Sequence, residues 1–370
     1  MTLSNQTEAS ASEKIKWPEI FSLAGLNAAV VLSWIAYHEY QPVLLKKFDL
    51  NELAQFLVIT KALVLVLIPP LAGYVADLIL KKNGKAFTIF TVGVAATAMT
   101  FMIVASIIQA GPLSALKPFL PYMIVLWLTA MNLFISPANS MLESFAPAKK
   151  LPIVMGVLFL ITEVLYGLEP LVVDMVRFFG DTTTFVVGGV LIAGTGIIFH
   201  RVSSNEVARK KTVLMDQEVK SAVSFKTYLI ILLIGLNLGL GKALLVEFFP
   251  KYIQKHFAEH GGNAPLLAAA LLIYSAILGF LLSRTVSKMN LVKVILSSVV
   301  VLYLGLAVLL TSPGFNLFVA GAFVVASGFS LINISGLPYA LNKLTVRHVT
   351  YGVGIFYGAS EIFSGLFEIY

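Results

Sequence analysis

Long apolar runs alternate with short polar segments along most of the chain. Eleven of these runs approach or exceed the roughly 20 residues that a helix needs to cross a lipid bilayer. The pattern therefore predicts an all-α polytopic membrane protein. The expected spans are Pro18–Leu45, Leu53–Leu80, Ala86–Ala110, Pro118–Phe145, Leu151–Val176, Thr183–His200, Tyr228–Tyr252, Ala264–Leu282, Leu291–Leu310, Phe315–Leu341 and Tyr351–Tyr370.

Composition supports this interpretation and adds little to it. Hydrophobic residues make up 58% of the 370 residues and charged residues only 12%, whereas an average soluble domain is about 25% charged. The chain has no cysteine, which excludes disulfides. Residues 1–17 are polar and lack the basic start and apolar core of a signal peptide, so we expect a disordered N-terminal tail.

Lysine and arginine are distributed unevenly between the two sides of the predicted membrane. With the N-terminus placed inside, the inside segments carry about three times as many of them as the outside segments. This bias predicts a cytoplasmic N-terminus in a cell membrane, either an inner or a plasma membrane. The net charge of +7 is then a topology signal with weak attraction to anionic lipids, and it requires no nucleic-acid partner.

The polar stretch Arg201–Lys226 predicts a division of the chain into two bundles. It indicates a cytoplasmic linker over residues 201–227, which joins a six-helix bundle at 18–200 to a second bundle of five spans at 228–370. An even number of spans would return the C-terminus to the cytoplasm, so we expect that a twelfth helix is missing from this chain. A native eleven-span protein is the alternative.

Three short motifs occur in both predicted bundles, in the same order. Each first copy is followed by its second: Gly25-Leu-Asn27 and Gly235-Leu-Asn237, Glu39-x-x-Pro42 and Glu247-x-x-Pro250, Asn132-x4-Pro137 and Asn333-x4-Pro338. The copies have the same orientation, so the halves are predicted to be parallel repeats. A membrane chain built from two similar halves is typically a transporter with its substrate site between them.

A compound motif lies between the second and third spans. Gly73 is followed after three residues by Asp77, and after six more by Gly84-Lys85. Gly73 would let two helices approach closely, and Asp77 could cap a neighbouring helix or pair with a lysine at a cytoplasmic gate. Gly354 and Gly358 form a second close-packing face in the last span. An ordinary helix end with a basic loop is the alternative reading of the first motif.

The Gly73–Lys85 pattern resembles the loop signature of the major facilitator superfamily, and this resemblance covers nearly the whole chain. The spacing of Asp77 and Gly84 is similar to that of its glycoside–pentoside–hexuronide symporter and sucrose-transporter branch. Pro338–Leu341 and Tyr351–Gly358 also look like the tenth and eleventh spans of that branch. The resemblance implies two six-helix bundles around a central cavity, lined by spans one, four, seven and ten, with solute moved by alternating access.

Two departures from the family pattern limit what the resemblance implies. The equivalent loop motif in the second half, Gly279-x3-Ser283-Arg284, lacks the acidic residue. The first two spans also lack the paired aspartates that bind a cation in melibiose-type symporters. Sodium coupling of that kind is therefore not expected.

Four charged residues lie well inside predicted spans: Lys61, Glu163, Lys242 and Glu361. Each would cost about 3 kcal/mol at the bilayer centre, so each should face protein or water. The implied fold places spans two and eleven against each other, which predicts a Lys61–Glu361 ion pair with Lys242 as a competitor for Glu361. Glu163 has no obvious partner, which suits it to proton exchange. These charges could instead be purely structural pairs.

Polar and aromatic residues on the predicted lining spans are candidate solute contacts. Amides both donate to and accept from hydroxyl groups, and aromatic faces suit sugar rings. Interhelical hydrogen bonding is the competing role. The candidates are Asn27, Trp34, Tyr37, Asn132, Asn139, Asn237, Lys242, Asn333 and Tyr339, with Lys61, Asp77, Glu163 and Glu361 as candidates for proton coupling or gating.

The chain lacks a phosphate-binding loop and the H-E-x-x-H and G-x-S-x-G motifs, and its loops are too short for a soluble catalytic domain. We therefore expect a monomeric, proton-coupled secondary transporter of a small polar solute, without cofactor or metal. A sugar or glycoside is expected from the resemblance, and a sugar acid from Lys61 and Lys242. Drug or lipid efflux, a polytopic membrane enzyme and a non-transporting scaffold are the alternatives.

Overall fold

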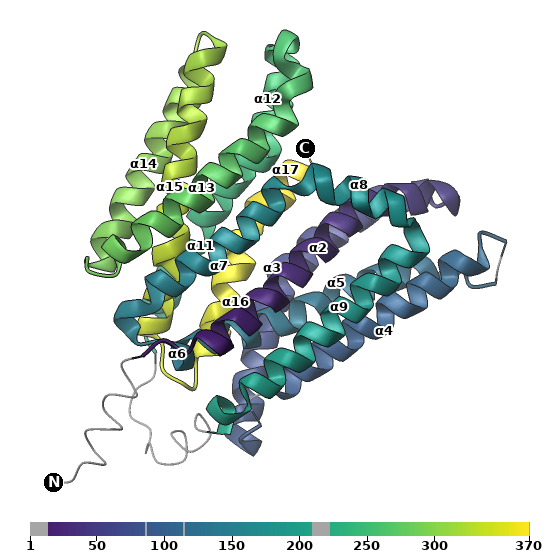
Figure 1. Cartoon of the computed structure of the whole chain (residues 1–370), viewed down its shortest axis with the longest axis horizontal. Helices are drawn as coiled ribbons and strands as arrows, with labels where there is room; N and C mark the ends of the chain where they lie inside the picture. Colours follow the sequence, from purple (N-terminus) through teal and green to yellow (C-terminus); the bar gives the residue numbers. More distant parts are fainter. Residues whose placement is uncertain (1–13, 86, 114, 209–222, 370) are drawn as a thin grey trace.

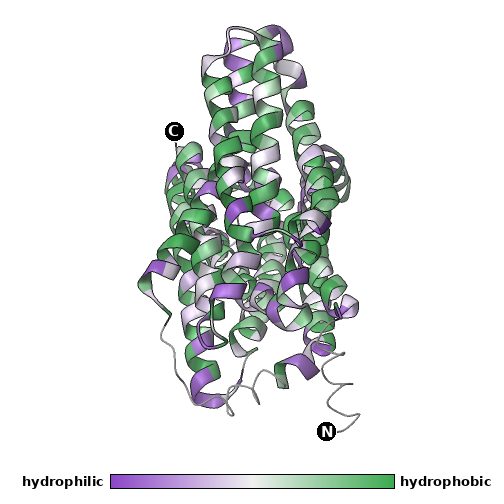
Figure 2. Cartoon of the chain, turned by 90° about the vertical axis from the view of Figure 1, so that its left-hand side faces the viewer, coloured by the Kyte–Doolittle hydropathy of each residue, from purple (hydrophilic) through white to green (hydrophobic). Residues whose placement is uncertain are grey.

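The computed structural model describes residues 14–85, 87–113, 115–208 and 223–369, and within these ranges the protein is all-helical. Ten helical stretches of the described chain are long and apolar enough to cross a membrane. Hydrophobic residues cover the lengths of the helices and polar ones gather toward their ends (Figure 2). The α-helices are α2 (Trp17–Lys47), α3 (Ala54–Asn83), α4 (Thr88–Ala110), α5 (Leu120–Ser140), α6 (Leu142–Phe145), α7 (Leu151–Gly167), α8 (Glu169–Phe179), α9 (Asp181–Val202), α11 (Phe225–Ala243), α12 (Phe249–His256), α13 (Ala264–Val286), α14 (Leu291–Thr311), α15 (Phe315–Lys343), α16 (Val349–Ser360) and α17 (Ile362–Ile369).

Each of the eleven predicted spans corresponds to a helix or to a helix with a break. Residues 1–13 of the expected tail and 209–222 of the expected linker lie outside the described ranges. The fifth span was predicted as one helix but breaks at Leu168, between α7 and α8. Pro170 accounts for the break, because its ring and missing N–H do not fit a helix interior.

Two further predicted spans are interrupted where they face the centre of the molecule. A π-helical turn over Leu244–Phe248 joins α11 to α12, and Pro250 is the second residue of α12. The eleventh span breaks at Glu361, between α16 and α17. There Gly239 of α11 lies so close to the carbonyl oxygen of Ser360 that a Cβ atom would come within 2.1 Å of it. π-turns of this kind occur often at functional sites.

The helices of each half of the chain pack together into a group, and contacts between α3, α7, α13 and α16 join the two groups (Figure 1). In the first half of the chain α4 packs against α5 and α9, and α2 packs against α9. In the second half α15 packs against both α13 and α14. The two halves meet where α3 packs against α16 and where α7 packs against α13. The predicted contact between spans two and eleven is therefore confirmed.

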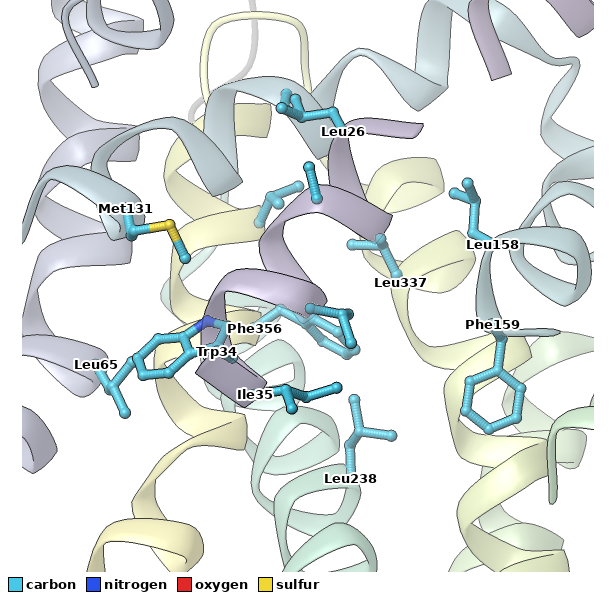
Figure 3. Packing of buried hydrophobic residues seen from close by; sticks show 14 of the residues in the cluster. Leu26, Trp34, Ile35, Leu65, Met131, Leu158, Phe159, Leu238, Leu337 and Phe356 are labelled. Carbon is cyan, nitrogen blue, oxygen red and sulfur yellow. The ribbon is translucent and has the colours of Figure 1, made fainter. Parts of the chain in front are cut away.

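Apolar side chains from both halves form one core cluster (Figure 3). Trp34 of α2 lies beside Leu65 of α3, and Ile35 of α2 lies on the side of Leu238 from α11. Phe356 of α16 is almost completely buried in the same cluster. Because α2, α11 and α16 share this core, it holds the helices around the centre of the molecule in register.

Glycines bring α3 and α16 into backbone contact. A Cβ atom on Gly73 would lie 2.3 Å from the carbonyl oxygen of Thr350, and one on Gly354 would lie 2.3 Å from that of Pro69. On Gly358 it would lie 2.4 Å from the carbonyl oxygen of Val66. Real Cβ atoms do not approach backbone this closely, so only glycine fits at these positions. The close-packing faces predicted at Gly73 and at Gly354 and Gly358 are confirmed.

We predict that Gly354→Ala lowers the thermal stability of the purified protein, because the added methyl group meets backbone that cannot move aside. The expected cost is about 1–3 kcal/mol, typical of overpacking. Gly25→Ala is the matched control, since nothing lies within 4 Å of a Cβ there, and alanine favours a helix over glycine by about 1 kcal/mol. Equal melting temperatures for the two variants would contradict the close contact.

Candidate solute-binding cavity

Two adjoining hollows lie between the halves of the protein. Their void volumes are about 990 and 1220 Å³, part of which is open solvent. We call the first the central hollow and the second, which holds most of the acidic residues, the acidic hollow. Together we call them the cavity. They adjoin, because six residues line both: Trp34, Ile135, Glu163, Tyr166, Lys242 and Glu361.

The central hollow brings together three of the predicted asparagines. Asn27 of α2, Asn139 of α5 and Asn333 of α15 line it, along with aromatic residues such as Phe159 and Tyr357. These residues come from spans one, four and ten, as the family resemblance implied. Spans five and eleven also contribute, through α7 and α16, which the resemblance had not assigned to the lining.

Hydrogen bonds within the protein fix the orientation of the amides. The Nδ2 atom of Asn139 donates to the carbonyl oxygen of Ile135 at 3.0 Å, and that of Asn132, which lines the acidic hollow, donates to Leu128 at 2.8 Å. Asn27 Nδ2 lies 3.5 Å from Asn139 Oδ1. A backbone carbonyl can only accept, so these contacts identify the nitrogen of each amide and use one of its two N–H groups. The side-chain carbonyl oxygens of Asn27 and Asn132 remain as acceptors.

Three of the predicted solute contacts lie away from both hollows. The ring of Tyr37 stacks on Trp127 with centroids 4.9 Å apart and lines a separate small pocket in the first half. Asn237 donates to the carbonyl oxygen of Leu233. The ring of Tyr339 is almost fully buried, with the Lys343 ammonium 6.0 Å from its centroid.

Lys242 and Glu361 face each other across the cavity. Nζ of Lys242 lies 3.9 Å from Oε1 of Glu361, and it lies 5.2 Å from the centroid of the Tyr166 ring. About a quarter of each charged side chain is exposed, 29% for Lys242 and 25% for Glu361. The expected competition of Lys242 for Glu361 is confirmed. The pair is long and open to the cavity, so it is easily exchanged for other partners.

The predicted Lys61–Glu361 ion pair is wrong, because Lys61 has a different partner. Nζ of Lys61 contacts Oε1 of Glu368 at 2.6 Å instead. The helix breaks at Glu361, which turns that residue toward α11, while α17 continues along α3. Gly365 lies against Ala62, one residue from Lys61. Glu368 is therefore at the level of Lys61.

Glu163 is the least compensated charged group in the cavity. It lines both hollows, its exposed fraction is 6%, and its Oε2 atom has no hydrogen-bond partner. The expectation that this carboxylate lacks a close partner agrees with the structure. An unpaired buried carboxylate is costly unless a proton or a cation neutralises it.

Three acidic groups nearer one end of the cavity, Glu169, Glu247 and Glu368, line the acidic hollow. Glu247 belongs to the repeated Glu-x-x-Pro motif, but Glu169 and Glu368 were not among the residues considered from the sequence, because they lie outside the centres of the predicted spans. Glu169 precedes Pro170 and Glu247 lies in the π-turn before Pro250. A glutamate one to three residues before a proline in an apolar run was therefore the available signal.

Asp77 closes the end of the molecule that carries the basic loop. Its carboxylate accepts hydrogen bonds from the backbone N–H groups of Thr350 at 3.3 Å and Tyr351 at 2.8 Å. These are unsatisfied donors of the first turn of α16, so Asp77 caps a helix of the other half. Thr350 also contacts Ser140 of α5 through its hydroxyl group at 3.4 Å. The proposed capping role of Asp77 matches this geometry.

The loops around this contact follow from local chemistry. Helix α3 ends at Gly84, whose φ of 63° is left-handed and suits glycine. His348 precedes α16 at the same end. Burial, with Lys81 and Arg347 nearby, lowers the pKa of His348, so the ring is neutral at neutral pH. No extra positive charge then opposes the N-terminus of α16.

Comparison with known proteins finds likeness in structure and none in sequence. No family model matches the chain, and no curated protein matches it in sequence. The human organic anion transporter MFSD10 (TETRAN) has a similar crystal structure, with a TM-score of 0.70 at 8% identity over 96% of this chain and 93% of that one. A bacterial homologue of the iron transporter ferroportin, in an outward-facing state with soaked iron, gives 0.71 at 14% identity over 96% and 90%.

The chain has the major-facilitator fold. Both neighbours are transporters of this fold, and the alignments cover nearly the whole of each chain. At such low identity the likeness shows the fold alone and leaves the sugar-transporter branch suggested by the sequence without support. The cavity lies between the two halves of this fold. Among the described residues, no cluster of His, Asp or Glu could hold a metal ion.

We predict that Asp77→Asn loosens the basic end of the molecule, because the amide caps α16 without its charge. A cap of this kind is worth about 1 kcal/mol. The native chain has no cysteine, so a single Ser140→Cys can report access by its rate of thiol labelling. That rate should rise roughly fivefold in the Asp77→Asn background. Labelling of exposed Asn51→Cys, in a different loop, should stay constant.

A double-mutant cycle tests the corrected ion pair. Lys61→Met and Glu368→Gln should couple by about 1 kcal/mol in thermal unfolding, because each leaves the other charge without its partner. Lys61→Met and Glu361→Gln should be additive, since Glu361 faces Lys242 instead. Coupling of Lys61 with Glu361 and not with Glu368 would restore the original pairing.

Proposed function

We propose that the protein is a monomeric secondary active transporter that moves a small polar solute across a cell membrane by alternating access, coupled to protons. The observation that carries the proposal is one cavity, shared by both halves, into which Lys242, Glu163 and Glu361 project. Charges placed in spans are costly, and their usual justification is a solute or proton pathway.

The contacts between the halves support a rocking motion. Asp77 and the glycines of the α3–α16 interface hold the basic end closed with few side-chain interlocks. From the lysine and arginine bias we infer that this end, and the N-terminus, lie on the cytoplasmic side. The acidic hollow would then extend from the centre toward the outside. Breaking the Asp77 cap would open the opposite path.

The side chains that line the cavity limit the kind of solute more than the fold does. The two structural neighbours are described as transporters of organic anions and of iron, so the fold accommodates very different cargo. Trp34 and the free amide oxygens are compatible with a sugar or glycoside. Efflux of an apolar drug fits less well, because five carboxylates line the acidic hollow.

Glu163 is the proposed proton-carrying group. We predict that Glu163→Gln reduces pH-gradient-driven uptake into proteoliposomes by roughly tenfold or more, because the amide cannot exchange a proton. The assay uses whichever solute of a sugar, sugar-acid and amine panel the wild type accumulates. Solute exchange without a gradient should persist at solute concentrations high enough to saturate the variant. Wild-type rates in both assays would remove Glu163 from the coupling mechanism.

Glu39→Gln is the matched control for this assay. Glu39 is also a carboxylate near a membrane-spanning helix end, but it pairs with the exposed Arg177 at 2.8 Å and lines neither hollow. Its loss should leave gradient-driven uptake near the wild-type rate.

A further inference from the structure

The acidic hollow contains more carboxylates than cationic groups. Two lysines, Lys61 and Lys242, line it together with His38. The carboxylates that line it are Glu163, Glu169, Glu247, Glu361 and Glu368. Unless protons or cations enter, the hollow therefore has an excess of negative charge, and low-dielectric walls concentrate its field.

Two of these carboxylates, Glu163 and Glu169, take part in none of the ion pairs of the cavity among the described residues. Lys61 pairs with Glu368 and Lys242 faces Glu361, as described above. Glu247 has a third lysine, Lys251, 3.7 Å away at the rim. Within the described chain, no lysine or arginine lies within 4 Å of Glu163 or Glu169. The carboxylates without an ion-pair partner in the described ranges are therefore Glu163, which lines both hollows, and Glu169, which lines only the acidic hollow.

Glu163 is the carboxylate of this pair that lines both hollows. It is more than nine-tenths buried and projects from α7 into both hollows, and Oε2 has no hydrogen-bond donor. A structural carboxylate at this depth would be expected to have a donor from the protein. The carboxylate lines both hollows, so a donor that enters the cavity meets a group whose buried Oε2 atom has no hydrogen-bond partner within the described chain.

The walls around Glu163 suit a positively charged group. Trp34, Tyr166 and Phe159 present aromatic rings to the central hollow. Such rings attract ammonium groups, and the protein already uses this contact, with the Lys242 ammonium over Tyr166. The amide of Asn27 offers a carbonyl oxygen as a further acceptor. Carboxylate, aromatic face and carbonyl oxygen together accept hydrogen bonds and donate few.

We infer that the cargo of this cavity is a small organic solute with an ammonium group, held by the Glu163 carboxylate between aromatic walls. The inference rests on the proposed transport function and narrows its substrate class. Lys242 shows that the cavity walls accept such a group, because its own ammonium lies near Glu361 and over the ring of Tyr166. A sugar acid would meet the unpaired charges of Glu163 and Glu169 and is disfavoured.

A set of probes that differ only in charge tests this inference. Phenethylamine, phenethyl alcohol and hydrocinnamate share one aromatic skeleton, and butylamine, butanol and butyrate form an aliphatic counterpart. We expect the amines to raise the melting temperature of the purified full-length protein, the alcohols to raise it less and the carboxylates not at all. The Glu163→Gln protein should bind the amines roughly tenfold or more weakly, whereas Glu39→Gln should bind them as the wild type does.

Each outcome decides for or against the ammonium cargo. Stabilisation by the carboxylates or alcohols at least as great as that by the amines, or no response to any amine, overturns it. So does undiminished amine binding by Glu163→Gln. If that variant fails to fold, Glu163→Asp replaces it, and loss of amine binding with the charge retained would contradict the role of this carboxylate as counter-ion.

Transport assays separate this inference from the proposed function. Proteoliposomes that bind an amine but never accumulate or exchange it would uphold the ammonium site and overturn the transporter proposal. Accumulation of a sugar by protein that no amine stabilises would do the reverse.

Discussion

The cost of placing charge inside a membrane is the constraint on which the rest of this structure depends. Hydrocarbon offers no partner to an ammonium or a carboxylate, so each charged group in a span must face protein or a wet cavity. Lys61, Glu163, Lys242 and Glu361 come from four different helices, and the fold turns all of them to one place. The cavity exists at the junction of the halves because only there can these groups meet.

Close helix packing provides the geometry that this constraint requires. Because Gly354 and Gly358 remove side chains from the α3–α16 interface, the two backbones touch, and α17 continues along α3 to place Glu368 beside Lys61. The same interface carries Asp77 to the first turn of α16 at the other end. One glycine-rich contact thus sets both an ion pair within the cavity and the closure of the basic end.

Periodic and compositional features were predictable from the sequence, whereas pairings between distant residues were only partly so. The spans follow from apolar runs and the cap at Asp77 from a compound motif, whereas the α3–α16 contact was expected from the fold that the family resemblance implies. The partner of Lys61 could not be predicted in this way. The helix breaks at Glu361, where Gly239 of another helix lies against Ser360, and the sequence pattern does not show such a contact. The asparagines were recognised as polar groups, but the commitment of Asn132 to Leu128 depends on local helix geometry.

The arrangement of charges in the cavity is a property of the side chains that the fold does not determine. The same fold occurs in a protein described as an organic anion transporter and in a bacterial homologue of an iron transporter. The fold therefore does not fix the solute, and the side chains of the cavity must do so. Here the helix interruptions near Pro170 and Pro250 place Glu169 and Glu247 on the same hollow as Glu163. Backbone irregularities at these prolines thereby add to the negative charge of the hollow.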